Sequence, residues 1–399
     1  MACGPLHGVK VIECAHMLSG PYCCQILGDL GAEVIKVEST GAGDRTRGLH
    51  PFSDPGGVSY GFLSRNRNKR SVCVDLASEE GREVMYRLVR DADVLVHNLR
   101  RTTMASLKLA YSDLKAVNPR LVYASISGFG EKGPYKDLPG EDMQAQAMSG
   151  ILSIIGYPDQ SSTPVGTQLG DATTGIVSAL GVVSALYARD RTGQGQEVTN
   201  SLLASLMAIQ PAALSYYLAS GQVQPKMGSS GSPTLPVPYG IWTAGDGKEM
   251  AVSSYRDWPK FCRCIGAPDL ADDPRFDTYE NRQANREELV GIVQEALSRR
   301  DRDAWISLLR AQDQWVVPVR DYEDIFSDTD SWDNGLVAEM EHPLAGRVRT
   351  FGGPLGFSET PEPPAKYPPI LGEDTRRVLV EAGYSDDEID GLLRKGAVK

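Results

Sequence analysis

Val9-Lys-Val-Ile-Glu-Cys14 is a short β-branched run that ends in a loop, His16-Met-Leu-Ser-Gly-Pro21. A helical pattern then runs to Leu30, and a second strand-like run covers residues 33–37. Strand, helix and strand in this order predict a βαβ unit with parallel strands and a right-handed crossover. We therefore expect the first half of the chain to build a parallel sheet.

Strand-like and helical patterns continue to alternate, with strand-like runs at residues 71–75, 93–97 and 121–125. This alternation predicts an α/β fold with a Rossmann-like, doubly wound parallel sheet. Such sheets bind ligands beyond the carboxyl ends of their strands. The expected ligand loops are residues 16–21, 38–47 and 97–104. The glycine fingerprint of dinucleotide sites and the Walker-type phosphate loop are both absent from the sequence.

The length of 399 residues favours two domains. We expect a large Rossmann-like domain at residues 1–220, completed by a returning C-terminal segment at residues 330–399. Residues 221–239 are rich in Gly, Ser and Pro, which predicts a linker or a lid. Residues 240–329 then form a smaller α+β domain.

The composition limits the class of protein. A net charge of -11 argues against nucleic acid and anionic membranes as partners. The seven cysteines, Cys3 among them, are odd in number and lack paired CxxC spacing, which indicates a reduced, cytoplasmic protein. No two of the five histidines, His50 among them, have metal-ligand spacing, so we expect no metal. No signal-peptide pattern is present, and no run approaches the length of a membrane span.

Asp171 lies in Gly166-Thr-Gln-Leu-Gly-Asp-Ala-Thr-Thr-Gly175, a glycine-bounded turn that leads into an apolar helical run. A carboxylate at a helix start can accept the free N–H groups of that helix, which favours its ionised form. An ionised carboxylate can attack an activated acyl group. Asp171 is therefore a candidate nucleophile; the alternative is that it only caps the helix.

A basic cluster, Arg65-Asn-Arg-Asn-Lys-Arg70, stands out in this acidic chain. It could bind phosphate, because charge-assisted bonds to phosphate are strong, or it could be a solvated basic loop. Arg100 and Arg101 follow another strand and favour the ligand interpretation.

Two further segments have open interpretations. Glu141 and Asp142 could position a substrate or act as a base, or they could simply precede a helix that begins at Met143. The segment Gly228, Ser229, Ser230, Gly231 could be a lid whose backbone N–H groups reach an acyl intermediate, or a plain linker.

The chain resembles the family III CoA transferases, the group that includes formyl-CoA and carnitine CoA transferases. The resemblance covers nearly the whole chain and rests on several motifs in one order: Gly8-Val-Lys-Val-Ile-Glu13, Ser19-Gly-Pro21, Leu27-Gly-Asp-Leu-Gly-Ala-Glu-Val-Ile-Lys-Val-Glu38, Asn68-Lys-Arg-Ser71, Thr192-Gly-Gln-Gly-Gln196 and Leu371-Gly-Glu-Asp-Thr375.

The resemblance implies an enzyme that moves CoA from an acyl-CoA donor to a carboxylic acid. It implies that Asp171 is the nucleophile, with aspartyl anhydride and aspartyl-CoA thioester intermediates. It also implies an interlocked homodimer of ring-shaped chains, with no tightly bound cofactor and a CoA thioester as substrate. The CoA-facing positions would be His16, Met17, Leu18, Ser39, Val74, Asp75, Leu76, Ala77, Asn98, Leu99 and Arg100; Asp142 would lie near the nucleophile.

Some positions differ from the family pattern. Arg101-Thr102 stands where many members have Pro-Gly, and Ser39 and Ser106 replace basic residues that contact CoA in some relatives. A racemase of the same fold is the alternative function. Related α-methylacyl-CoA racemases place a His before the acidic residue, where this chain has Glu141; this difference counts against a racemase without eliminating it, since a carboxylate can also be a base. A CoA-binding protein without catalysis is the third.

Overall fold

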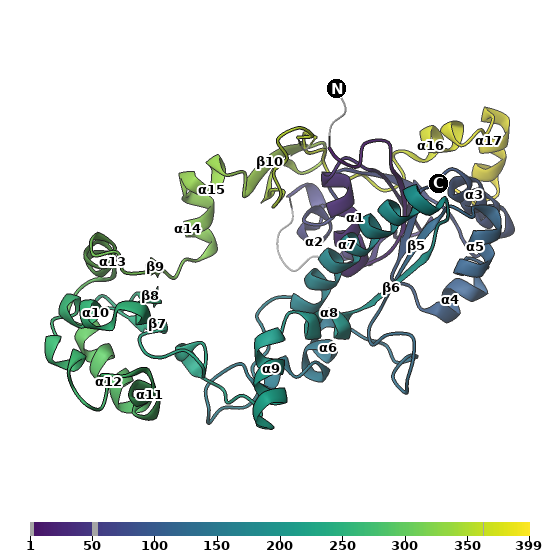
Figure 1. The fold of residues 1–399 in the computed structure, drawn as a ribbon. Helices are drawn as coiled ribbons and strands as arrows, with labels where there is room; N and C mark the ends of the chain where they lie inside the picture. Colours follow the sequence, from purple (N-terminus) through teal and green to yellow (C-terminus); the bar gives the residue numbers. More distant parts are fainter. Residues whose placement is uncertain (1–3, 50–54, 362) are drawn as a thin grey trace. The chain divides into compact units, whose positions relative to one another are not determined.

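The computed structural model describes residues 4–49, 55–361 and 363–399; Cys3 and His50 lie outside this range. The chain forms two compact units (Figure 1). The first comprises Met1–Ser149, Gly166–Ile209 and Thr329–Lys399, and the second comprises Gly150–Val165 and Gln210–Asp328. Residues 150–165 and 210–220 thus belong to the second unit, whereas the sequence analysis placed them in the large domain.

A six-stranded parallel sheet forms the centre of the first unit. Its order is β3-β2-β1-β4-β5-β6, which is the Rossmann order. The predicted parallel α/β sheet is therefore confirmed. The strands are β1 (Lys10–Cys14), β2 (Glu33–Glu38), β3 (Lys69–Cys73), β4 (Val94–His97), β5 (Val122–Ser127) and β6 (Glu197–Ser201).

Alternate strand residues pack against helices on opposite faces of the sheet. Val11 points into one core with α1 (Ser19–Asp29), α7 (Leu169–Thr192) and α8 (Leu202–Ala208). Ile12 points into the other core with α3 (Glu79–Arg90), α5 (Tyr111–Val117), α16 (Thr375–Glu381) and α17 (Asp386–Arg394). The C-terminal helices therefore complete the core of the first unit beside α3 (Figure 1).

β6 interrupts the apolar helical run that follows Asp171, and the sequence pattern did not predict this strand. The helix α7 ends at Thr192, with Gly193 in the left-handed conformation, and residues 197–201 join the sheet. This strand, Glu-Val-Thr-Asn-Ser, has no apolar alternation because it lies at the edge of the sheet and is half exposed. The remaining apolar run forms α8 and α9 (Pro211–Ser220).

α7 corrects a second expectation, because it is long and apolar enough to cross a membrane. Half of its most apolar window is buried, and it packs closely against α1. Val182 and Leu186 belong to the core of the first unit. A core helix passes the same test of length and apolarity, so α7 is weak evidence for a membrane span.

The second unit has a small antiparallel sheet, consistent with an α+β pattern. Its strands are β7 (Gly240–Thr243), β8 (Glu249–Val252) and β9 (Val316–Pro318). Its helices include α10 (Trp258–Cys264), α11 (Tyr279–Ala284), α12 (Arg286–Leu297), α13 (Arg302–Ala311) and α14 (Tyr322–Ser327). In the first unit, α15 (Thr329–Asp333) precedes a hairpin of β10 (Val337–His342) and β11 (Gly346–Phe351).

A buried ion network crosses the sheet of the first unit. The Lys36 ammonium on β2 lies 2.6 Å from Glu13 on β1 and 2.8 Å from Asp44 in the loop after β2. Glu13 also pairs with Lys69 on β3 at 2.8 Å. Lys36 and Glu13 have no exposed surface, and Asp44 and Lys69 are only 1% and 4% exposed. Charges in such a place are stable only when they are paired.

We predict that Lys36→Met lowers the free energy of unfolding by about 3–5 kcal/mol, because it leaves the buried carboxylates of Glu13 and Asp44 undercompensated. Chemical denaturation measures the change. The matched control is Lys395→Met, which removes an exposed ion pair with Glu80 and should change stability little. An equally small effect of Lys36→Met would contradict the structural role of the network.

Candidate active site

The ligand loops meet at the carboxyl edge of four adjacent strands, β3, β2, β1 and β4. His16, Met17 and Leu18 follow β1, Ser39 follows β2, and Asn98 begins the segment after β4. The sheet order reverses between β1 and β4, which is where doubly wound folds bind their ligands. The structure therefore brings the expected CoA positions to one edge.

The loops after β1 and β4 are fixed to each other by Asn98. Its Nδ2 donates to the carbonyl oxygen of His16 at 2.7 Å, and the His16 N–H donates to Oδ1 of Asn98 at 2.9 Å. Met17 then adopts φ 68°, a left-handed conformation unusual for a side chain of this size. Asn98 thus holds this loop in place.

Not all of the expected CoA positions present a side chain at this edge. Val74 is 2% exposed and bridges Val398 near the C-terminus, while the Asp75 N–H donates to the carbonyl of Ala397 at 2.8 Å. The C-terminal return therefore uses backbone groups of this segment. Leu76 and Ala77 lie further along the same loop, and Leu99 and Arg100 lie between β4 and α4 (Arg101–Ser106).

Asp171 is the third residue of α7, and Gln168 is the N-cap. Its carboxylate accepts hydrogen bonds from the hydroxyl and the backbone N–H of Ser19, in the first turn of α1. The sequence pattern predicts that Asp171 accepts N–H groups of its own helix, but its donors come from the neighbouring helix α1. Ser19 lies within the first expected ligand loop, residues 16–21, but no role was predicted for it from the sequence.

The environment of Asp171 raises its pKa to about 6. Burial is the largest cause and the negative charge of Asp142 is the next, while Ser19 and Arg65 act in the opposite direction. The carboxylate is therefore mostly ionised at neutral pH, yet it binds a proton more tightly than an ordinary Asp. A more basic carboxylate in a half-buried position is a better candidate for a nucleophile.

Asp142, the first residue of α6 (Asp142–Met148), caps α7. Its Oδ1 accepts the N–H groups of Gly170 at 2.7 Å and Asp171 at 3.1 Å. Its Oδ2 accepts the Gln146 amide at 2.5 Å. A Cβ on Gly170 would lie 3.0 Å from this Oδ1, so glycine permits the close approach. Anionic caps stabilise helix N-termini.

This arrangement gives Asp142 and Glu141 different tasks from those considered in the sequence. Asp142 is 9% exposed and both of its oxygens are bonded within the protein, so it positions α7 rather than offering a free base. Glu141 precedes α6 and its side chain is exposed without capping that helix. Neither arrangement favours an acid/base pair across a substrate.

The basic cluster is neither a phosphate cradle nor a solvated loop. Arg67 pairs with Asp29 and also donates to the carbonyl of Phe351. Lys69 pairs with Glu13, and Arg70 pairs with acidic residues that include Glu381. These three cations hold the fold together and are not free to bind phosphate. Arg65 differs from them, because it makes no ion pair within 4 Å in the part of the chain that the structure describes.

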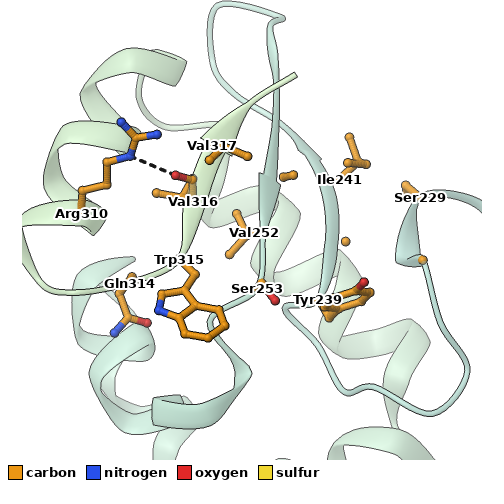
Figure 2. A pocket seen from close by; sticks show the side chains of 13 residues that line it. Ser229, Tyr239, Ile241, Val252, Ser253, Arg310, Gln314, Trp315, Val316 and Val317 are labelled. Carbon is orange, nitrogen blue, oxygen red and sulfur yellow. Dashed lines mark hydrogen bonds between the residues drawn. The ribbon is translucent and has the colours of Figure 1, made fainter. Parts of the chain in front are cut away.

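Gly228–Ser230 forms a short 3-10 turn in the second unit. A Cβ on Gly228 would lie 2.6 Å from the ring of Tyr157, so glycine is needed there. Ser229 and Gly231 line a cavity of about 630 Å³ together with Tyr239, Trp315 and residues of β7, β8 and β9 (Figure 2). The segment is thus a structured part of a pocket wall rather than a plain linker. Its role as a lid remains a prediction.

A second cavity, of about 570 Å³, lies in the first unit, and residues of β4, β5, α4 and α5 line it. His97, Tyr123, Arg101 and Lys115 line it. Burial lowers the pKa of His97 to about 4, so this imidazole is neutral at pH 7. Arg101 was a candidate ligand residue in the sequence, but nothing in the sequence pattern connects it with Tyr123. Among the described residues, no three His, Cys, Asp or Glu side chains group as metal ligands.

Comparisons with known proteins agree with this architecture. The model of CoA-transferase family III matches residues 6–375. Succinyl-CoA:glutarate CoA-transferase of Mus musculus is 33% identical over 397 residues, covering 99% of this chain and 90% of the mouse protein. Succinyl-CoA:mesaconate CoA-transferase of Haloarcula marismortui is 35% identical over 390 residues, covering 95% and 97%. The crystal structure of a CAIB/BAIF family protein from Brucella suis matches with a TM-score of 0.85 and 34% identity, covering 95% of this chain and 100% of that chain.

We predict that Asp171→Asn raises stability at pH 8 by about 1–2 kcal/mol. A shift of roughly two pKa units corresponds to about 3 kcal/mol, and partial exposure reduces it. Because the folded-state pKa, about 6, is above the ordinary 3.8, the stabilising contribution is complete below pH 3.8 and is lost as the pH rises through 6. The gain from Asn should therefore vanish near pH 4 in thermal unfolding. Asp190→Asn, an exposed control on α7, should show no such pH dependence; an equal gain for Asp171→Asn at both pH values would contradict the perturbed carboxylate.

Proposed function

The chain belongs to CoA-transferase family III, and we propose that it transfers CoA from an acyl-CoA donor to a carboxylic acid, with Asp171 as the nucleophile. The observation that carries this proposal is the half-buried Asp171 carboxylate, held by Ser19 and with its pKa raised to about 6. The names of the relatives support the reaction class, because both act between a CoA thioester and a carboxylic acid.

The chemistry proceeds through four exchanges at carbonyl carbons. Asp171 attacks the donor acyl carbon, the C–S bond breaks, and CoA thiolate leaves a mixed anhydride. The thiolate attacks the Asp171 carbonyl and releases the donor acid, forming an aspartyl-CoA thioester. The acceptor carboxylate displaces the thiolate to give a second anhydride, and the thiolate then takes the acceptor acyl group. Asp171 is regenerated, and no redox step or net proton transfer is required.

Ser19 is placed to stabilise the negative charge that develops during these exchanges. Each attack on the Asp171 carbonyl places negative charge on an oxygen of that carboxyl group. The Ser19 N–H and hydroxyl already donate to this group, and preorganised donors at a developing oxyanion lower the barrier. The loops of His16, Ser39 and Asn98 at the carboxyl edge are the proposed CoA contacts, and CoA is a substrate rather than a resident cofactor.

The proposed assembly is the interlocked homodimer of ring-shaped chains. Ile176, Leu180 and Tyr187 on α7 are 53%, 66% and 61% exposed. Their spacing places them along one side of the helix, and an exposed apolar stripe of this kind favours a protein partner. The six cysteines that the structure describes are free, which supports the proposed cytoplasmic location.

Mass spectrometry after brief incubation with a panel of acyl-CoA thioesters tests the proposal. We expect a CoA-sized adduct on Asp171, or a hydroxamate when hydroxylamine is present, because both intermediates carry an activated Asp171 carboxyl group. Asp171→Asn should give no adduct, and the surface control Asp190→Asn should give the same adduct as the unaltered protein.

Two other results would contradict the transferase. Exchange of the acyl α-hydrogen with deuterated solvent, without an adduct, would establish the racemase. CoA binding without adduct or exchange for any donor would indicate a CoA-binding protein without catalysis.

A further inference from the structure

We propose that Arg65 binds the carboxylate of the acceptor acid and thereby selects the acceptor. This inference rests on the proposed transferase function and assigns a residue to one substrate of that reaction. It starts from the basic cluster, in which Arg67, Lys69 and Arg70 are held by carboxylates, whereas Arg65 pairs with no carboxylate among the residues that the structure describes.

The contacts of Arg65 leave most of its donors available. Its Nη1 donates to the carbonyl oxygen of Met17 at 3.3 Å, and its Nε donates to the hydroxyl of Ser64 at 3.4 Å. Both bonds are long, and neither acceptor is charged. A guanidinium has five N–H donors in a planar fork that suits a carboxylate. The bond to Met17 orients the side chain without neutralising it.

The acidic groups near Arg65 are already bound to other donors. Asp44 pairs with Lys36 at 2.8 Å and accepts two hydrogen bonds from Thr46. Burial would raise the pKa of Asp44, but Lys36 and Thr46 outweigh it and hold that pKa well below its usual range. Asp171 is bound by Ser19. Arg65 therefore influences both carboxylates through space, and among the described residues its donors make only the two long bonds to Met17 and Ser64.

A cation at this place would favour the binding of an acceptor acid. Asp171 and Asp142 already bring negative charge to the start of α7, and the positive charge of Arg65 acts on Asp171. An acceptor acid enters as a carboxylate while Asp171 is a neutral thioester, so the negative charge of Asp142 remains to repel it. The donor acyl group is different, because its reacting carbonyl is uncharged. The half-buried guanidinium of Arg65, whose charge acts on Asp171, would therefore attract the carboxylate of the acceptor more strongly than the uncharged thioester of the donor.

The experiment separates the two half-reactions at pH 8, where Asp171 is ionised. Exchange of labelled CoA into an acyl-CoA with an uncharged acyl chain reports attack by Asp171 and needs no acceptor. Saturation of the full transfer with the acceptor acid reports acceptor binding. The variants are Arg65→Gln and Arg65→Lys; Arg90→Gln, at an exposed position on α3, removes the same charge as a control.

We expect Arg65→Gln to raise the KM for the acceptor about 10- to 100-fold, the loss typical of a bond to a charged group. Its CoA exchange should stay within about threefold of the unaltered protein. Arg65→Lys should recover part of the acceptor affinity because it keeps the charge, and Arg90→Gln should change neither quantity.

Three results would overturn the inference. An unchanged acceptor KM in Arg65→Gln would show that Arg65 does not contact the acceptor. A parallel fall in CoA exchange would show that Arg65 acts on Asp171 rather than on the acceptor. Equal losses in Arg65→Gln and Arg65→Lys with a lowered melting temperature would indicate a structural role. CoA exchange in the unaltered protein tests the transferase itself: if it is absent, the function fails, whereas exchange with an unchanged acceptor KM defeats only the role of Arg65.

Discussion

The buried pairing of Lys36 with Glu13 and Asp44 is the constraint on which the ligand edge depends. It joins β1, β2 and the loop after β2 at the place where the strands end. Asp44, fixed in this way, accepts the N–H of Met17 at 3.4 Å, and Glu13 fixes Lys69. Burial would lower the pKa of Lys36, but Glu13 and Asp44 outweigh it and raise that pKa above its usual value. Most charged side chains of this region therefore hold the loops in place, and few of them are available to bind a ligand.

Two helix starts then place the reactive carboxylate. Asp142 caps α7 and so fixes the backbone of Asp171, while Ser19 at the start of α1 holds its side chain. Close packing of α1 and α7 makes this possible, since a Cβ on Gly175 would lie 3.0 Å from the carbonyl oxygen of Ser19. The close packing that orients Asp171 also buries it and raises its pKa. Burial therefore makes the carboxylate more basic and, at neutral pH, also lowers the stability of the folded chain.

The sheet was predictable from the sequence because β-branched strand patterns alternate with amphipathic helical patterns, and few folds other than a parallel sheet accommodate this order. β6 was not, because an edge strand lacks the apolar pattern of a buried one. The basic cluster was misinterpreted because the partners of Arg70, Glu33 and Glu381, are distant in sequence. Asp171 was found through its glycine-bounded turn and the family resemblance, but the donors that hold it come from α1. Such partners depend on tertiary packing, which local patterns do not encode.

The proposed mechanism requires each acyl group to form an anhydride with the carboxylate of Asp171. An acceptor acid labelled with oxygen-18 in its carboxylate tests this claim directly, because anhydride chemistry leaves one acceptor oxygen on the nucleophile. After many turnovers, peptide mass spectrometry should find oxygen-18 in the side chain of Asp171. An unlabelled Asp171 in an enzyme that has converted the labelled acid to its CoA thioester would contradict the account.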